Sequence, residues 1–231
     1  MFEQTADLYD LVYADKDYEA EARWVRAAVA VHAPDARTLL DVACGTGRHL
    51  AHLEGHYACR GLELNPSLAA IATERCAVPV HVGDMDDFDL GVRFDVVTCL
   101  FSAIGYSRDL GGAIEAMARH VAPGGVLIVE PWFSPDEWLP GTIHLVDHEA
   151  GGTRVVRMTH SGIDGNVAVM EMHHLVGTPA GVEHLVDTHH MTLFTEHEYE
   201  AAFRSAGLTF DLDRPGPFGR GALIGRPPAR D

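Results

Sequence analysis

The sequence predicts an α/β fold, with a mostly parallel sheet covered by helices on both faces and an antiparallel sheet inserted after the fifth strand. From about residue 38 to residue 130, short apolar runs typical of buried strands alternate with helical patterns. From 131 to about 190 the helical period disappears, and alternating β-like runs are separated by glycine turns. The length of 231 residues, 47% of them hydrophobic, suits one domain with one elaboration.

The first helix is expected to begin at Asp17, a favourable N-cap residue, and to end before Pro34. The strands of the first half are predicted at 38–43, 59–64, 78–84, 94–101 and 125–130, with helices from about residues 48, 66 and 109. In such sheets the ligand lies beyond the carboxyl ends of the strands, near the point where strand order reverses. We therefore expect functional residues at these ends.

The inserted strands are predicted at 142–148, 153–161, 167–176 and 182–194. A helix at 196–207 and strands at 208–213 and 221–226 then return to the main sheet. This pattern predicts a core made of residues 1–130 and 191–231 and an inserted subdomain of residues 131–190. We interpret the insertion as a lid and substrate pocket, and the alternative is an appendage for dimerisation.

Composition excludes several classes of function. Lys and Arg number 17 against 34 Asp and Glu, a formal charge of −17, so nucleic acid and anionic membranes are disfavoured as partners. Four cysteines without a close pair fit reduced thiols in the cytoplasm. The N-terminus is acidic and unlike a signal peptide, and no apolar run approaches about 18 residues. Although there are 15 histidines, adjacent pairs on a strand point to opposite faces, so no metal is expected.

The strongest motif is DVACGTGRHL at 41–50, where a strand turns into a helix. Gly45 and Gly47 allow a sharp bend and a close approach of the backbone to a ligand. The third glycine of the dinucleotide fingerprint would stand at Leu50, so the nicotinamide pattern is incomplete. No Lys-Ser or Lys-Thr pair follows, which disfavours a phosphate-binding loop. Asp41 suits a cationic ligand.

Acidic residues end the next two strands. Glu63, 22 positions after Asp41, is placed to accept hydrogen bonds from two ribose hydroxyls. Asp84 can accept the exocyclic amine of adenine, and Met85 can pack on the base. Each acid has a plainer explanation as a turn, helix-cap or loop residue. Together, in this order, they predict a site for an adenosine-bearing sulfonium, S-adenosyl-L-methionine.

The segments LLDVACGTG, GLEL, GDMDDF, FDVVTC and APGGVLIVE resemble the class I S-adenosylmethionine-dependent methyltransferases. That resemblance implies a Rossmann-like seven-stranded methyltransferase sheet. Further segments, including LYDLVYADKDYEAEA, CLFSAIGY, VEPWFSP, RMTHS, MEMHH and GPFGRG, resemble the N-methyltransferases of nucleotide-linked 3-amino-deoxysugars. Those enzymes methylate the amine of a dTDP-hexose on the way to macrolide sugars such as desosamine and mycaminose. The resemblance also implies a homodimer.

The resemblance and the residue types together assign roles. Cofactor-binding residues are expected to be Tyr13, Tyr18, Asp41, Ala43, Gly45, Gly47, Glu63, Leu64, Asp84, Met85, Cys99 and Leu100. Catalytic residues are expected to be Tyr106, which steers or deprotonates the amine, Glu130, which holds the ammonium or a sugar hydroxyl, and His160. Substrate contacts are expected from Tyr106, Trp132, Arg154, Arg157, His173 and Arg220, the arginines pairing with a diphosphate.

Four other interpretations remain open from the sequence. A methyltransferase for another small acceptor, such as an amino acid, an aminoglycoside or a hydroxyl group, would keep every cofactor residue and change the insertion. A non-enzymatic module would bind the cofactor without an acceptor cavity. A nicotinamide oxidoreductase is disfavoured by Leu50. Nucleic-acid methylation is disfavoured by the charge and by the absence of an Asn/Asp-Pro-Pro-Tyr/Phe sequence after the fourth strand.

Overall fold

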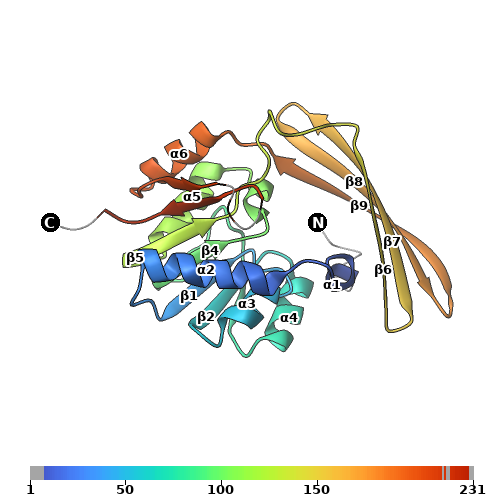
Figure 1. Ribbon diagram of the computed structural model, residues 1–231, viewed down its shortest axis with the longest axis horizontal. Coiled ribbons are helices and arrows are strands. Elements are labelled where there is room, and N and C mark those ends of the chain that lie inside the picture. The colour runs from blue at the N-terminus through green and yellow to red at the C-terminus, as the bar shows by residue number, and fades with distance from the viewer. Residues whose placement is uncertain (1–7, 215, 217–218, 229–231) are drawn as a thin grey trace. The chain divides into compact units, whose positions relative to one another are not determined.

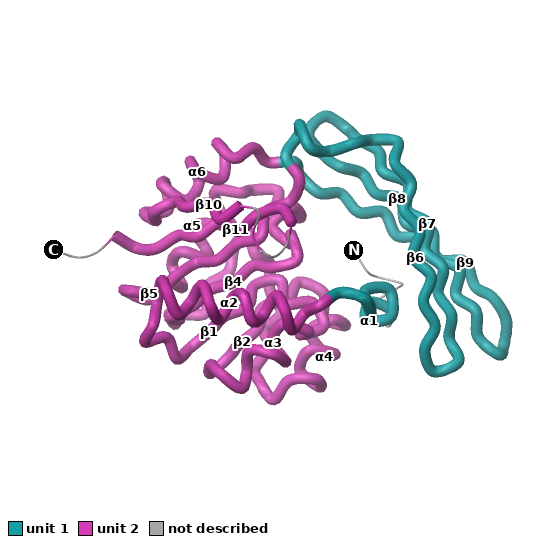
Figure 2. Tube along the Cα trace, viewed as in Figure 1, with its two compact units in different colours: residues 1–16, 134–193 teal, residues 17–133, 194–231 magenta. Residues whose placement is uncertain are grey.

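The computed structural model describes residues 8–214, 216 and 219–228. The chain divides into two compact units (Figure 2). The core unit holds Asp17–Phe133 and the chain from Phe194 onward; the sheet unit holds Ser134–Leu193 and the N-terminal segment up to Lys16. The insertion therefore begins and ends within three residues of the expected bounds. The described residues before Asp17 belong with the insertion, whereas the sequence placed them in the core.

The core unit contains a seven-stranded sheet in the order β10-β11-β5-β4-β1-β2-β3 (Figure 1). Its strands are β1 (Thr38–Val42), β2 (Ala58–Glu63), β3 (Val80–Val82), β4 (Phe94–Cys99), β5 (Val121–Val129), β10 (Asp211–Asp213) and β11 (Ala222–Gly225). The first five are parallel, and β11 runs antiparallel to both β5 and β10. Strand order reverses between β1 and β4, so a ligand is expected at their carboxyl ends. The seven-stranded sheet predicted from the sequence is confirmed.

Helices cover both faces of this sheet. They are α2 (Tyr18–His32), α3 (Arg48–Leu53), α4 (Pro66–Arg75), α5 (Leu110–Arg119) and α6 (Glu196–Ser205). One buried cluster joins α2, α3 and α4 to the sheet through residues such as Val25 and Leu53. The other joins α5 and α6 through residues such as Met117 and Phe203. Asp17 caps α2 as predicted, its carboxylate accepting the Ala20 N–H at 2.8 Å.

The start of β5 differs from the expected strand at 125–130. The helix ends at Arg119, and β5 begins at Val121, which pairs with Phe94 before the register shifts. A β-carbon on Gly125 would lie 2.5 Å from the Asp95 carbonyl oxygen, so this irregular start of the strand requires glycine. The shift leaves the carboxyl end of β5 where the sequence placed it.

The sheet unit is a four-stranded antiparallel sheet in the order β6-β7-β8-β9. Its strands are β6 (Ile143–Ala150), β7 (Thr153–Asp164), β8 (Val167–Thr178) and β9 (Gly181–Thr192). The four strand predictions are confirmed, and the turns predicted between them contain Gly151, Gly152 and Gly165 with positive φ. The short helix α1 (Tyr9–Val12) packs against this sheet next to Val155 and Val176. Among the described residues, no helix has the length and apolar character to span a membrane.

The two faces of this sheet differ in exposure. The covered face contains buried side chains of alternate residues, among them Val155, Thr159, His174, Val176 and His189. The open face contains large apolar side chains that are 40–65% exposed: Ile143, Leu145, Met158, Leu175 and Val186. Successive strand residues point to opposite faces. The pairing register of the strands therefore determines both the buried side chains of the covered face and the exposed ones of the open face.

Candidate functional site

The turn between β1 and α3 depends on its glycines. Gly45 and Gly47 have φ of +58° and +76°, a region that favours glycine. A β-carbon on Gly47 would lie 3.1 Å from both Ala72 Cβ and Cys76 Sγ. Gly47 therefore provides the left-handed start of α3 and also allows α4 to pack closely. The open backbone predicted for this motif is present.

Glu63, at the end of β2, holds this turn in place. Its Oε2 accepts the Gly45 N–H and its Oε1 accepts the Asn65 N–H, both at 2.9 Å. Burial raises the pKa of the carboxyl, while the backbone donors at Asn65 and Gly45 oppose the rise. Leu64 is a third backbone donor to this carboxylate, so three backbone donors meet a group with four lone pairs. The structure thus brings together Gly45 and Glu63, which the sequence assigned to one site.

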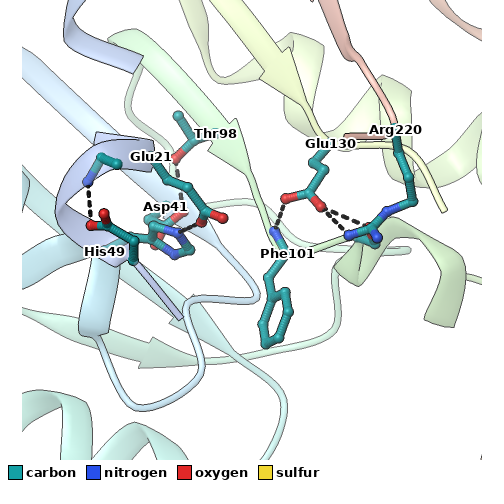
Figure 3. Close-up of polar contacts among 10 residues, drawn as sticks. Glu21, Asp41, His49, Thr98, Phe101, Glu130 and Arg220 are labelled. Carbon is teal, nitrogen blue, oxygen red and sulfur yellow. Dashed lines mark hydrogen bonds and ion pairs between the residues drawn. The ribbon is translucent and has the colours of Figure 1, made fainter. Parts of the chain in front are cut away.

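Asp41 lies behind the turn and is 1% exposed. Its Oδ1 accepts the Thr98 hydroxyl at 2.7 Å (Figure 3). Burial raises the pKa of this carboxyl to about 6, and the charge of nearby His49 limits the rise. His49 Nε2 lies 2.7 Å from Glu21 Oε2, which links α3 to α2. Because the Asp41 side chain is not accessible, it can act on a bound cation only through its charge and not by direct contact.

The ends of β3 and β4 provide the remaining cofactor positions. Asp84 is half-buried, and its Oδ1 accepts the Asp86 N–H at 3.0 Å. Met85 is half-buried against the core, and Leu64 is exposed. The side chains of Cys99 and Leu100 are buried in the core, so these two residues can face a ligand only through their backbone.

A polar cluster joins the ends of β4 and β5 (Figure 3). Glu130 is fully buried and accepts the Phe101 N–H at 2.6 Å, the Ser102 hydroxyl at 2.9 Å and the Arg220 guanidinium at 2.5 Å. The Arg220 guanidinium also lies over the Trp132 ring, 5.5 Å from its centroid. These contacts correct two expectations. The Glu130 carboxylate is not accessible to the ammonium of an acceptor, and the Arg220 guanidinium neutralises Glu130 instead of standing open for a diphosphate.

Aromatic side chains surround the turn and the end of β4. Tyr18 is buried edge-on against His49, with ring centroids 4.9 Å apart, and lies 6.4 Å from the Phe101 ring. Tyr106 is half-buried at the end of a short 3₁₀ helix, Ala103–Tyr106. The core unit therefore brings Tyr18, the turn and the end of β4 into one region.

The four residues predicted on strands of the sheet unit do not share one face. Arg157 is on the covered face, where it donates to the Tyr13 hydroxyl at 3.1 Å and lies over that ring. The other three, Arg154, His160 and His173, alternate onto the open face. Arg154 is exposed and bonds both oxygens of Asp147, and His173 contacts Glu171 and His184. The substrate contacts expected from this sheet therefore do not all lie on one of its faces.

Sequence reasoning missed three members of the core site. His49 and Glu21 were recognisable as polar residues that helical spacing places among apolar ones. Ser102 was not, because its backbone has a φ of +55° and nothing in its side chain predicts that conformation.

Comparison with known proteins places this geometry in a family. The methyltransferase domain family matches residues 13–212. A dTDP-3-amino-3,6-dideoxy-alpha-D-glucopyranose N,N-dimethyltransferase from Streptomyces fradiae is 46% identical over 98% of this chain and 92% of its own length. A dTDP-3-amino-3,4,6-trideoxy-alpha-D-glucopyranose N,N-dimethyltransferase from Streptomyces venezuelae is 43% identical over 96% of this chain and 97% of its own.

Solved structures agree. The crystal structure of DesVI from Streptomyces venezuelae matches with a TM-score of 0.92 and 42% identity, covering 96% of this chain and 98% of that one. CalS10, an S-adenosylmethionine-bound amino pentose methyltransferase from Micromonospora echinaspora, matches with a TM-score of 0.86 and 38% identity, covering 94% and 95%. The donor set fits the same cofactor, because the polar side chains predicted at the strand ends are carboxylates, which suit a sulfonium and repel a pyrophosphate. The chain belongs to the class I S-adenosylmethionine-dependent methyltransferases.

Proposed function

We propose that this enzyme transfers a methyl group from S-adenosylmethionine to the amine of a dTDP-linked amino-deoxysugar. The observation that carries the proposal is the extent of the similarity to the aminosugar N,N-dimethyltransferases. It runs through 98% of the chain at 46% identity and so includes the sheet unit. A demethylmenaquinone methyltransferase from Mycolicibacterium gilvum, which has a different acceptor, is 31% identical over 62% of the chain.

The core residues divide the work of binding the cofactor. We assign the ribose hydroxyls to Glu63, the adenine amine to Asp84 and the base to Met85. The turn containing Gly45 and Gly47 admits the methionyl part, with Ala43, Leu64 and the backbone of Cys99 and Leu100 beside it, and Tyr18 closes the region from α2. Asp41 contributes its negative charge, which favours a cation at the turn.

The acceptor side requires orientation more than acid–base chemistry. The cofactor supplies an electrophilic methyl group, which the amine lone pair attacks in line with the methyl–sulfur bond. Correct orientation can provide about 7–11 kcal/mol, whereas a general base contributes about 10²–10⁴-fold. We assign this orienting role to Tyr106, and contacts to the sugar nucleotide to Trp132 and Arg157.

A binding and turnover experiment tests this proposal. We expect S-adenosylhomocysteine and dTDP each to raise the melting temperature, and dTDP-3-amino-3,6-dideoxyglucose to gain one or two methyl groups by mass spectrometry. The matched control is dTDP-glucose, which has no amine and should gain none. Stabilisation by S-adenosylhomocysteine without stabilisation by dTDP, and without methylation of the aminosugar, would mean that another small molecule is the acceptor.

We propose that the enzyme is a homodimer and that the open face of the sheet unit is its interface. Three strands of twelve residues and one of eight, about 4.8 Å apart, cover roughly 700 Å², close to the about 800 Å² per partner of a standard interface. Large apolar side chains lie on this face among charged ones such as Arg154, Asp147 and Glu171, and a second copy of the same face is a partner that would bury the apolar ones.

Sedimentation velocity tests the dimer. Leu145→Glu, which puts a charge on the open face, should yield monomers, whereas Val31→Glu, at an exposed apolar position of α2, should leave the dimer intact. A wild-type monomer at micromolar concentration would contradict the proposal.

We further propose that the enzyme works in the cytoplasm on a small molecule and not on nucleic acid. All four cysteines are free and buried, in keeping with a reducing compartment, and the net charge of −17 opposes binding to phosphate backbones.

A further inference from the structure

Two consecutive residues after β4 have a left-handed backbone although neither is glycine. Phe101 has a φ of +54° and Ser102 a φ of +55°. This conformation is unfavourable for any residue with a β-carbon, and it persists only where the surrounding structure imposes it. The turn after β1, in contrast, places glycine at two of its three positive-φ positions.

A single buried carboxylate holds both residues. Glu130 Oε2 accepts the Phe101 N–H at 2.6 Å (Figure 3). Glu130 Oε1 lies 2.9 Å from the Ser102 hydroxyl. Ser102 Oγ also lies 2.8 Å from the Pro131 carbonyl oxygen. Because these groups are buried and one of them is charged, the hydrogen bonds are of the stronger kind.

The Arg220 guanidinium offsets the cost of burying the Glu130 carboxylate. Its Nη2 donates to Glu130 Oε1 at 2.5 Å and its Nε donates to Ser102 Oγ at 2.9 Å. A fully buried carboxylate without a cation would be strongly unfavourable. Arg220 reaches this point from a segment in which Gly219 and Gly221 both have positive φ. The cluster therefore connects three separate parts of the chain at the ends of β4, β5 and β11.

The strained pair lies between the two halves of the site. Cys99 and Leu100, expected beside the methionyl part of the cofactor, come immediately before it. The 3₁₀ helix that carries Tyr106 comes immediately after it, with Ser102 as its N-cap residue. The backbone rotation at Phe101 and Ser102 therefore sets where Tyr106 lies relative to the end of β4.

We propose that Glu130, paired with Arg220, is a positioning residue that holds the left-handed Phe101–Ser102 pair and so fixes Tyr106 for methyl transfer. The kinetic part of this inference rests on the proposed function. The conformational part does not, because it concerns the chain alone.

The experiment starts from Glu130→Gln, which keeps the shape of the side chain and removes its charge. We expect kcat to fall about tenfold or more, because small displacements of an orienting group are costly, while the affinity for S-adenosylhomocysteine changes less than about threefold. Amide hydrogen exchange over residues 99–106 should become faster. The matched control is Glu137→Gln, which removes an exposed carboxylate that likewise accepts a backbone N–H and a serine hydroxyl and should change neither quantity.

Rescue distinguishes positioning from general stability. In the Glu130→Gln background, Ser102→Gly and Ser102→Ala both remove the hydroxyl, but only glycine adopts a positive φ without strain. We expect glycine to recover at least about threefold in kcat over alanine. Equal activity of the two double variants, or unchanged kcat and exchange in Glu130→Gln, would overturn the inference.

The inference is also tested if Glu130→Gln does not fold or if the wild type has no activity on the aminosugar. If Glu130→Gln does not fold, Ser102→Gly and Ser102→Ala are compared in the otherwise wild-type chain, where glycine should again be the more active and alanine the less; equality overturns the inference. If the wild type methylates no dTDP-aminosugar, the proposed function fails, while faster exchange over 99–106 in Glu130→Gln still supports the positioning role and unchanged exchange refutes it.

Discussion

The core unit and the sheet unit place their functional side chains by different rules. In the core, residues far apart in sequence meet because parallel strands end at one edge, so Gly45 and Glu63 contact each other at 2.9 Å. In the sheet unit, three positions separate Arg154 from Arg157 on β7, and alternation sends them to opposite faces. In the core, Gly45 and Glu63 meet because each lies at the end of a strand. In the inserted sheet, the alternation of side chains along a strand determines which face a residue is on.

The largest expected effect breaks the core turn. Gly47→Ala should lower the free energy of unfolding by about 2–4 kcal/mol, because the residue has a positive φ and its β-carbon meets Ala72 and Cys76 at 3.1 Å. The control is Gly55→Ala, where a β-carbon meets nothing within 4 Å, and which should be close to neutral. Urea unfolding measures both. Equal stability of the two variants would show that the turn tolerates a side chain at position 47. The arrangement of the core site would then not depend on this glycine.

The next effect concerns the buried charge that the core retains. Burial raises the pKa of Asp41 from 3.8 to about 6, so the folded state favours the protonated form. The contribution of this carboxyl to the free energy of unfolding is fully present below about pH 4. It is lost as the pH rises through about 6, a change of about 3 kcal/mol. Asp41→Asn should therefore stabilise the protein without cofactor above about pH 7 and much less at about pH 4.5.

Chemical denaturation at the two pH values measures the stability, and calorimetry measures the binding of S-adenosylhomocysteine and S-adenosylmethionine. We expect Asp41→Asn to weaken the binding of the cationic methyl donor more than that of the product, which lacks the sulfonium charge, because Asp41 acts on the ligand through its negative charge. A stability difference independent of pH would contradict the raised pKa, and equal loss for both ligands would remove the electrostatic role.

The sequence predicted the core well and the side-chain environment poorly, for identifiable reasons. Glycines, terminal acids and apolar runs are local signals, and they located the turn, Glu63 and the strands. Nothing local indicated that Glu130 is fully buried beneath Arg220, because this ion pair joins residues 90 positions apart. Nor did any local signal place the residues before Asp17 with the sheet unit, since their partners, such as Val155, come much later in the chain. The opposite faces of Arg154 and Arg157 were predictable, because the strand had been identified and parity alone separates them.

A smaller effect sharpens the role of the β2 end. Glu63→Gln removes the charge that is proposed to accept two ribose hydroxyls, and hydrogen bonds to charged groups contribute about 1.5–3 kcal/mol each. We expect the affinity for S-adenosylhomocysteine to fall by about 10- to 100-fold in calorimetry. The control is Glu74→Gln, an exposed position on α4 that should bind as the wild type does. An unchanged affinity in Glu63→Gln would leave the carboxylate with only its contacts to backbone donors, those of Asn65, Gly45 and Leu64.

The smallest effect separates the two faces of the sheet unit. Arg157→Ala should raise the KM for the aminosugar nucleotide by about tenfold, because Arg157 is on the covered face with Tyr13 and its charge is proposed to meet the diphosphate. Arg154→Ala should change the same KM by less than about twofold, since Arg154 is an exposed residue paired with Asp147. Steady-state kinetics at saturating cofactor measures both. If Arg154→Ala had the larger effect, the acceptor would bind on the open face, and that face could not also be the interface of a homodimer.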